Sequence, residues 1–249
     1  APHFPLHAIQ EDIDRFRERY KGGWNQIQDE RWKRQKKIGI AKGKLPEPEQ
    51  NIGPPYHFAE AYKILGPGEV NLPIPWKQLT DVQKDFQATK MAIHAAMIYR
   101  MDLEIGRILD QIRKMKAFED TLVLFLSDNG ASAEIMVRGD GHDPKAPPGS
   151  AYTYLCLGPG WSTTCNTPFR RHKTWVHEGG CATPLVVHWP NGIQARGELC
   201  QTVGHVIDIV PTLIEVAGEK ARGKWKRRNA PEAPGHSLLQ AFAQEGETR

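Results

Sequence analysis

Apolar side chains recur at helical intervals in two long stretches of the chain. In residues 10–38 they lie three to four positions apart among charged residues, with an interruption at Gly22 and Gly23. Between about residues 80 and 115 the same spacing produces one continuous apolar face, and Thr80 with Asp81 supplies a suitable N-cap. This periodicity predicts a broken helix followed by one long amphipathic helix.

Short runs of consecutive apolar residues follow the second helix. Residues 121–126 and 184–188 are such runs, and residues 152–157 form a weaker one. Runs of this kind are typical of strands that are buried on both faces of a parallel sheet. A last helix is expected over about residues 208–217, with Gly218 as its C-cap. Helices that alternate with buried strands predict an α/β sandwich built on a largely parallel sheet.

The remaining segments have little regular pattern. Residues 43–76 are rich in proline and glycine and lack periodicity, which predicts a long irregular excursion over the surface. Residues 219–249 have the composition of a linker, and the chain begins without an initiator methionine inside a motif-like Pro-His-Phe-Pro. We therefore expect the chain to be part of a longer protein. No run approaches the roughly 20 consecutive apolar residues that a membrane span needs, so no membrane partner is expected.

Composition and charge narrow the functional classes only slightly. The 249 residues carry a formal net charge of +4, and their apolar and charged fractions are those of an ordinary globular protein. Basic residues cluster at 31–37 and 224–228, but nearby acidic residues favour solvated faces, so no nucleic-acid partner is expected. The four cysteines lack Cys-x-x-Cys spacing, which argues against a zinc site or redox pair and favours buried free thiols.

Candidate chemistry begins where the first apolar run ends. Residues 122–126 lead directly into Ser127, Asp128, Asn129 and Gly130, and ligands of open α/β sheets bind beyond the carboxyl ends of the strands. A carboxylate and an amide carbonyl are hard oxygen donors that suit Ca²⁺ or Mg²⁺. Asp-Asn-Gly is also an ordinary turn sequence, so these residues alone leave both interpretations open.

A second concentration of polar residues lies just before the apolar run at 184–188. The segment 166–190 reads NTPFRRHKTWVHEGGCATPLVVHWP. Its charged and titratable side chains before the run are Arg170, Arg171, His172, Lys173, His177 and Glu178. Cations that converge at a strand edge bind a tetrahedral oxyanion. The alternative is a solvated charged loop, although such a loop rarely runs without a break into a core strand.

Together with their neighbours, these segments resemble the sulfatase family within the alkaline-phosphatase-like superfamily. The matching pieces, in order, are APHFPLHA at 1–8, MDLEIGRILDQI at 101–112, LFLSDNGA at 124–131, NTPFRRHKTWVHEGG at 166–180, TPLVVHWPNGI at 183–193 and HVIDIVPTLIEVAG at 205–218. The resemblance implies an α/β sandwich that is incomplete at its N-terminal side. It also implies a partial catalytic domain at 1–218 and, at 219–249, a linker toward a truncated C-terminal subdomain.

The resemblance implies roles for individual residues as well. Asp128 and Asn129 match the pair that coordinates the active-site calcium, for which Mg²⁺ is a possible substitute. Lys173 matches the lysine that contacts the sulfate and its bridging oxygen, and His3 matches the histidine that helps to protonate the departing alcohol. The Glu-Gly-Gly turn at 178–180 matches an architectural element that holds the loop carrying Lys173.

One essential element of the family is missing from the sequence. Sulfatases carry an N-terminal Cys/Ser-x-Pro-x-Arg motif, whose Cys or Ser is oxidised to the nucleophile formylglycine, and two further metal-binding aspartates. Neither residues 165–170 nor residues 181–184 have the required spacing. We therefore expect formylglycine only in an N-terminal part that precedes these residues, and we expect the isolated chain to be inactive.

Three other histidines are weaker candidates. His142 lies in a glycine-rich loop after the expected metal pair, and His172 and His177 flank Lys173, so all three are candidate substrate-binding residues, with plain loop residues as the alternative. The resemblance implies a sulfated small molecule or a sulfated carbohydrate as substrate, and a periplasmic or extracellular location. The sequence leaves the oligomeric state open.

Two further functions stay open on the sequence alone. A phosphonate or phosphodiester hydrolase of the same superfamily has the same fold, and only the missing nucleophile segment separates it from a sulfatase. A non-catalytic module that binds anions or nucleic acid through the basic clusters is the third alternative. The salt dependence of nucleic-acid binding tests that alternative.

Overall fold

The computed structural model describes residues 2–56, 58–139, 141–194, 197–220, 223–225, 228–229 and 234–243. The chain divides into two compact units. The first unit contains Ala1–Gln111 and Asn129–Pro184, and the second contains Ile112–Asp128 and Leu185–Arg249. Much of the predicted linker at 219–249 lies outside the described residues, as does Asp140 in the loop that precedes His142.

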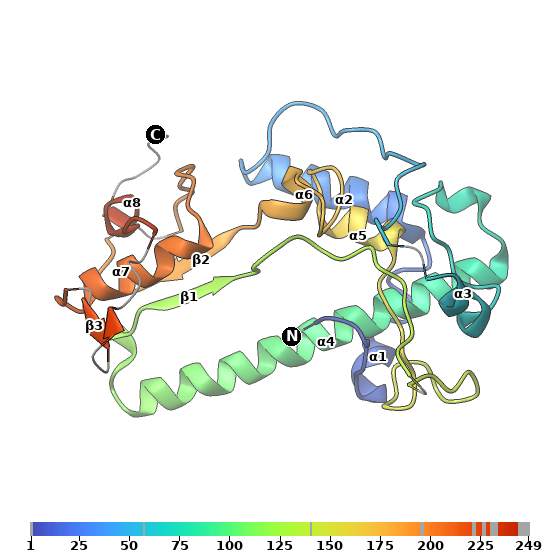
Figure 1. The fold of residues 1–249 in the computed structure, drawn as a ribbon, viewed down its shortest axis with the longest axis horizontal. Coiled ribbons are helices and arrows are strands. Elements are labelled where there is room, and N and C mark those ends of the chain that lie inside the picture. Colours follow the sequence, from blue (N-terminus) through green and yellow to red (C-terminus); the bar gives the residue numbers. More distant parts are fainter. Residues whose placement is uncertain are drawn as a thin grey trace. The chain divides into compact units, whose positions relative to one another are not determined.

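The broken helix that periodicity predicts is present in the first unit. α1 spans Gln10–Phe16 and α2 spans Gly23–Lys37 (Figure 1). The break has a steric cause, because Gly23 has a φ of +82° and a Cβ atom there would lie 2.0 Å from the ring of Trp76. Glycine alone fits this close approach and adopts this backbone angle without strain, so α2 begins at the break.

The long amphipathic helix is also confirmed. α4 spans Asp81–Lys114 and follows the predicted cap residue, Thr80. The Thr80 hydroxyl accepts a hydrogen bond from the N–H of Gln83 (3.2 Å), and the Gln83 side chain accepts one from the N–H of Thr80 (2.9 Å). This capping box satisfies N–H groups that the helix itself leaves unpaired. Of the helices that the structure describes, none is both long enough and apolar enough to cross a membrane.

The excursion at 43–76 is less irregular than predicted. It contains α3, Ala59–Leu65, and leads into a 3-10 turn, η1, at Trp76–Gln78. Ala61 and Leu65 are buried in a core to which α4 also contributes. The sequence pattern missed α3 because a helix of 7 residues has fewer than two turns, so one apolar pair four positions apart is its only periodic signal.

Two apolar cores stabilise the first unit. The members of the first core come from the N-terminal segment, α1, α3, α4 and the extended segments near residues 135 and 155; they are Leu6, Ile13, Ala61, Leu65, Ala92, Ile93, Ala96, Ile135 and Leu155. The second core is built around three tryptophans. Trp24 of α2 meets Trp76 and Trp161 edge-to-face, with ring centroids 4.9 Å and 5.7 Å apart. Trp161 belongs to α5, Pro159–Cys165, so this core fixes α5 against α2.

The second unit contains the two main predicted strands and the last predicted helix. β1 spans Val123–Leu126 and β2 spans Leu185–His188. α7 spans Ile209–Val216 and is followed by Gly218, whose φ of +68° suits a helix C-terminus. The other described elements of this unit are η2 (Phe118–Asp120), η3 (Val206–Asp208), β3 (Lys224–Trp225), β4 (Arg228–Asn229) and α8 (Leu239–Ala243).

The largely parallel sheet predicted from the apolar runs is not confirmed among the described residues. β1 and β2 pair antiparallel, with Val123 opposite His188 and Leu126 opposite Leu185. The weaker run at 152–157 is buried but forms no strand. An apolar run indicates burial, whereas strand direction depends on a partner that the run does not specify. Among the described residues, the α/β fold therefore consists of helices and two small antiparallel strand pairs.

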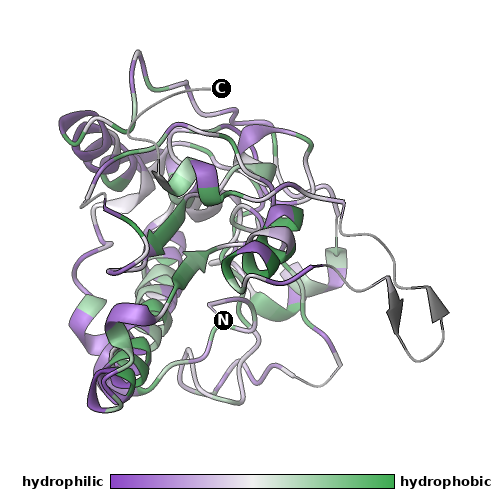
Figure 2. Ribbon diagram, turned by 90° about the vertical axis from the view of Figure 1, so that its left-hand side faces the viewer, coloured by the Kyte–Doolittle hydropathy of each residue, from purple (hydrophilic) through white to green (hydrophobic). Residues whose placement is uncertain are grey.

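Both main strands expose apolar side chains, although burial on both faces was predicted. Phe125 is 49% exposed and Val186 is 57% exposed, and Figure 2 shows the two strands as apolar, in green. Among the described side chains of the second unit, Thr212 alone is buried. The apolar runs therefore predicted the positions of the two strands but not their exposure.

Replacement of Ile93 by alanine is expected to lower the free energy of unfolding by about 2–5 kcal/mol, because the side chain is fully buried and its removal leaves a cavity. Val186→Ala is the matched control, since its exposed side chain should change that free energy by no more than about 0.5 kcal/mol. Urea denaturation measures both values. A loss at Val186 as large as that at Ile93 would show that the strand is buried in solution.

Candidate functional site

The loop that carries Lys173, residues 166–177 (the lysine loop), connects α5 to α6, which spans Glu178–Cys181. Arg171 and Thr174 in this loop have φ angles of +69° and +77°. Left-handed angles are unfavourable by about 1–2 kcal/mol for residues with a Cβ atom, and β-branched threonine adopts them rarely. Such residues persist only where the surrounding structure holds them. Lys173 lies between these two strained positions.

Backbone hydrogen bonds attach the lysine loop to the residues that follow Asn129. The N–H of Lys173 donates to the carbonyl of Ala131 (3.1 Å), and the N–H of Gly130 donates to the carbonyl of Gly180 (3.0 Å). The N–H of Gly179 in α6 donates to the carbonyl of Arg170 in the loop (3.0 Å). Residues 130 and 131 are therefore hydrogen-bonded to the lysine loop and to α6, and α6 is hydrogen-bonded back to the start of the loop.

Three glycines make this approach possible. A Cβ atom on Gly130 would lie 1.8 Å from the carbonyl oxygen of Gly179, and one on Gly179 would lie 2.2 Å from that of Arg170. A Cβ atom on Gly180 would lie 2.1 Å from the carbonyl oxygen of Trp175. Because every clash is with backbone, no side-chain rotation relieves it. The Glu-Gly-Gly turn thus has the architectural role that the sequence resemblance implies.

His3 and Lys173, the two predicted catalytic residues, are in contact. The ammonium nitrogen of Lys173 lies 3.3 Å from Nε2 of His3, although the residues are 170 positions apart. Nδ1 of His3 lies 3.0 Å from the carbonyl oxygen of Phe4. A carbonyl only accepts hydrogen bonds, so the proton of the neutral ring is assigned to Nδ1, and Nε2 accepts from Lys173.

Buried contacts hold the N-terminal segment that carries His3. The N–H of Leu6 donates to the carbonyl of Leu155 (2.9 Å). His94 on α4 hydrogen-bonds to the backbone of Pro2, the neighbour of His3. Burial lowers the pKa of His94 to about 4, so its ring is neutral, and its Nδ1 has no hydrogen-bond partner. The single N–H of this ring is therefore committed to Pro2.

The predicted metal ligands are assigned to different units, although they are adjacent in the sequence. Asp128 is exposed and is the last residue of its stretch in the second unit, whereas Asn129 is half-buried and begins a stretch of the first unit. Both supply hard oxygen donors, which is the ligand type that calcium prefers. Among the described residues there is no group of three or more His, Cys, Asp or Glu side chains placed to hold a metal. The donors fit calcium in kind, and a complete shell needs further ligands.

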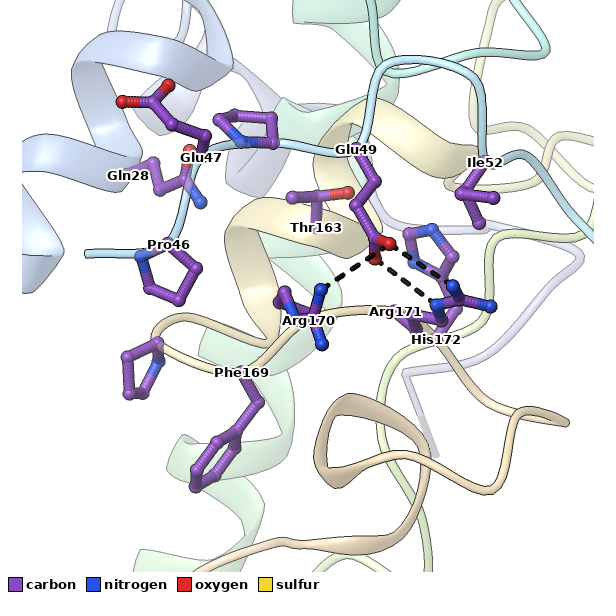
Figure 3. Close-up of a pocket in the computed structure, with 12 residues that line it drawn as sticks. Gln28, Pro46, Glu47, Glu49, Ile52, Thr163, Phe169, Arg170, Arg171 and His172 are labelled. Carbon is purple, nitrogen blue, oxygen red and sulfur yellow. Dashed lines mark hydrogen bonds and ion pairs between the residues drawn. The ribbon is translucent and has the colours of Figure 1, made fainter. Parts of the chain in front are cut away.

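Two cations of the lysine loop, Arg170 and Arg171, have an acidic partner within the chain. Arg171 makes two hydrogen bonds to the carboxylate of Glu49 (3.1 and 3.2 Å), and Arg170 lies 3.6 Å from it (Figure 3). Glu49 belongs to the excursion at 43–76, far away in sequence, so the loop's own sequence gave no sign of it. This carboxylate directs both guanidinium groups into a small pocket of their own.

The three candidate substrate-binding histidines lie in different environments. His172 is buried, its Nδ1 lies 2.8 Å from the Ser162 hydroxyl, and burial lowers its pKa to about 4. It therefore points into the protein, which argues against direct contact with a substrate. His142 accepts a hydrogen bond at Nδ1 from the N–H of Tyr154 (3.0 Å). His177 is half-buried at the start of α6, and substrate binding by these two residues stays a prediction.

The expectation of buried free cysteines is confirmed only in part. All four cysteines are free, which agrees with the prediction that no pair is required. Cys156 is buried, whereas Cys181 and Cys200 are exposed. Burial raises the pKa of Cys156 to about 12, so that thiol stays protonated and unreactive.

Sequence reasoning missed Asn166 and Ser162. The Asn166 amide bridges two segments of the site, and the Ser162 hydroxyl donates to the carbonyl of Ala131 (2.8 Å). Asn166 opens the quoted segment NTPFRRHK, where an asparagine two residues before a proline was a usable sign of a turn. Ser162 lies in the middle of α5, and no local signal marks it.

Comparison with known proteins gives the family of this chain. The profile of the sulfatase family matches residues 1–219, and the chain belongs to that family. This membership confirms the resemblance seen in the sequence. It supports the α/β class of the fold and a hydrolase as the class of the protein.

Several sulfatases are similar to this chain. An uncharacterized sulfatase of Schizosaccharomyces pombe is 28% identical over 240 residues, which are 90% of this chain and 40% of that protein. An arylsulfatase of Klebsiella aerogenes is 31% identical over 230 residues, 88% of this chain and 44% of that enzyme. The human steryl-sulfatase is 28% identical over 137 residues, 54% of this chain and 20% of that protein. The chain thus spans less than half the length of these relatives.

Gly130→Ala is expected to disrupt the site, because the new Cβ atom would meet the Gly179 carbonyl. We expect a loss of about 2 kcal/mol or more in the free energy of unfolding of the first unit. Gly106→Ala is the matched control, since nothing lies within 4 Å of a Cβ atom at this position in α4. It should raise that free energy by about 0.5–1 kcal/mol. Equal effects of the two substitutions in urea denaturation would contradict the close approach at Gly130.

Stability is expected to fall as the pH falls from about 6.5 to about 4. In the folded chain the pKa values of His94 and His172 are about 4, below the ordinary 6.5, so the unfolded chain binds protons that the folded chain excludes. For each imidazole, the free energy of unfolding changes by up to about 1.4 kcal/mol per pH unit in this range. The stabilisation from each neutral ring is fully present above pH 6.5 and is lost as the pH falls toward 4. Urea denaturation across this range measures the slope. His94→Gln should flatten it, and an unchanged slope would mean that His94 is not buried in its neutral form.

Proposed function

We propose that the full-length protein is a sulfuric ester hydrolase of the arylsulfatase type, which cleaves a sulfate monoester with calcium and a formylglycine nucleophile. The contact between Lys173 and His3 at 3.3 Å carries the proposal, because it joins a cation and a proton carrier at one point. Membership in the sulfatase family and similarity to an arylsulfatase support the same reaction class.

Lys173 acts on the charge of the reacting group in this proposal. Its ammonium group neutralises charge on the sulfate and on the bridging oxygen as that oxygen departs. The backbone bonds and strained turns of the lysine loop fix the ammonium group in advance, so little reorganisation accompanies the reaction.

His3 supplies the proton for the departing alcohol. The Phe4 carbonyl holds the Nδ1 proton, and this contact turns Nε2 toward Lys173. In the step itself both ring nitrogens carry a proton, so Nε2 no longer accepts from Lys173. Nε2 instead donates its proton to the bridging oxygen as the bond from that oxygen to sulfur breaks, which leaves a neutral imidazole and avoids release of an unstable alkoxide.

Asp128 and Asn129 are the calcium ligands of this chain in the proposal, and Mg²⁺ is a chemically similar alternative. Calcium bound there supplies electrostatic stabilisation to the sulfate oxygens. The nucleophile and the remaining ligands come from outside these 249 residues. The isolated chain is therefore inactive in this proposal.

The proposed substrates are sulfated small molecules or sulfated carbohydrates. The similar proteins include an arylsulfatase and a steryl-sulfatase, whose names refer to two kinds of sulfate ester. A periplasmic or extracellular location is part of the same proposal, by analogy with the family.

Lys173→Ala in the full-length protein is expected to lower kcat for a chromogenic aryl sulfate by about 10²-fold or more, as is typical for the loss of one pre-placed charge donor. Lys145→Ala is the control, because Lys145 is an exposed lysine of another loop and should leave the rate unchanged. Initial rates with and without a calcium chelator measure both effects. An undiminished rate in the Lys173 variant would show that this lysine does not act on the sulfate.

The same assay separates the proposal from its alternatives. Turnover of an aryl phosphodiester or phosphonate without turnover of the sulfate would identify a phosphoryl hydrolase of the same superfamily. Calcium-dependent sulfate turnover by residues 1–249 alone would contradict the part of the proposal that concerns the isolated chain.

A further inference from the structure

We propose that Asn166 is a positioning residue that sets the place of Lys173 relative to Asn129. The inference rests on the proposed function only in so far as Lys173 acts on the sulfate. Its structural content, that one side-chain amide fixes the lysine loop against residues 129–131, is independent of the reaction.

The backbone that carries the Asn166 side chain is held firmly in place. It is the C-cap residue of α5, and its own N–H donates to the carbonyl of Ser162 (3.0 Å). Only 9% of the residue is exposed, and α5 itself is fixed by Trp161 in the tryptophan core. The side chain therefore starts from a rigid part of the first unit.

Both ends of the Asn166 amide are used, each on a different segment. Oδ1 accepts a hydrogen bond from the N–H of Ala131 (2.8 Å), two residues after Asn129. Nδ2 donates to the carbonyl of Arg171 (3.0 Å), two residues before Lys173. Asn166 therefore acts as a bridge of fixed length between the two segments. The Ser162 hydroxyl lies beside this bridge and contacts the carbonyl of Ala131 and Nδ1 of His172 (2.8 Å each).

The bridge holds the lysine loop at its strained point. Arg171 has a left-handed backbone, and strained residues persist only when neighbouring groups hold them. The Asn166 amide holds its carbonyl, and the Lys173 N–H then reaches the carbonyl of Ala131. Without the amide, Arg171 can relax toward an ordinary backbone angle, which rotates the chain that follows and displaces the ammonium group of Lys173.

The chemistry of the bridge requires an amide. Asn166→Asp keeps an oxygen to accept from the N–H of Ala131, but it removes the donor to Arg171 and sets a carboxylate against that carbonyl. A role in packing alone would be preserved by this nearly isosteric substitution. A role as donor and acceptor together would be lost.

The test compares Asn166→Ala and Asn166→Asp with Thr164→Val in the full-length protein. Thr164 is a matched control, because it lies in the same helix, is buried, and its hydroxyl donates to the carbonyl of Trp24 (3.1 Å) instead of to the site. All three variants should lower Tm. Both Asn166 variants should also lower kcat by about tenfold or more with a smaller change in KM, as a displaced reacting group does, whereas Thr164→Val should keep the kcat of the parent.

A second readout does not depend on turnover. Limited acetylation with acetic anhydride, followed by mass spectrometry, gives the reactivity of Lys173 relative to the exposed Lys145. The half-buried Lys173 should react severalfold faster in both Asn166 variants and at the parental rate in Thr164→Val.

The outcomes separate the two proposals. Parental kcat in Asn166→Asp, or losses in the Asn166 variants no larger than in Thr164→Val, would overturn the positioning role, as would unchanged acetylation of Lys173. If the parent protein hydrolyses no sulfate ester, the proposed function fails, and the acetylation ratio alone decides whether Asn166 positions Lys173. If Asn166→Ala does not fold, Asn166→Asp decides in its place.

Discussion

The direct packing of Gly130 against Gly179 is the constraint on which the candidate site depends. At this point two stretches of backbone touch without any side chain between them, and the hydrogen bond from Gly130 to Gly180 closes beside the contact. A methyl group at Gly130 would force the two stretches apart, and one at Gly179 would meet the carbonyl of Arg170 in the lysine loop. The bond from Lys173 to Ala131 and the unfavourable angles at Arg171 and Thr174 then follow, because the loop has no room to relax.

His3 reaches the same place by another route. Its segment is held by the bond from Leu6 to Leu155 and by the neutral, buried ring of His94. Two independent supports therefore meet at the contact between His3 and Lys173, one from the N-terminal segment and one from the glycine contact. Neither support uses the charged groups themselves, so the pair stays available for a negatively charged ligand.

Features with strong local signals were predictable from the sequence. A few adjacent residues determine each of them: the capped start of α4, the break before α2 and the end of α7. Thr80 with Gln83 at the start of α4 is an example. The contact of His3 with Lys173 was predictable only through the resemblance to sulfatases. Other features depend on segments far apart in the chain. They are the direction of β1 relative to β2, the pairing of Glu49 with Arg171 and the bridge made by Asn166. No local pattern specifies such partners. The roles of Asp128 and Asn129 stay predictions.

The pairing of Glu49 with two arginines has an electrostatic consequence. One carboxylate offsets part of two positive charges, so the lysine loop shows less of its formal charge to its surroundings than its sequence suggests. Because Glu49 takes no part in the contact between Gly130 and Gly179, its substitution by a neutral residue changes the local potential by a full unit charge without touching that contact. The charge of this one residue therefore adjusts how strongly the lysine loop attracts an anion and how readily it releases it.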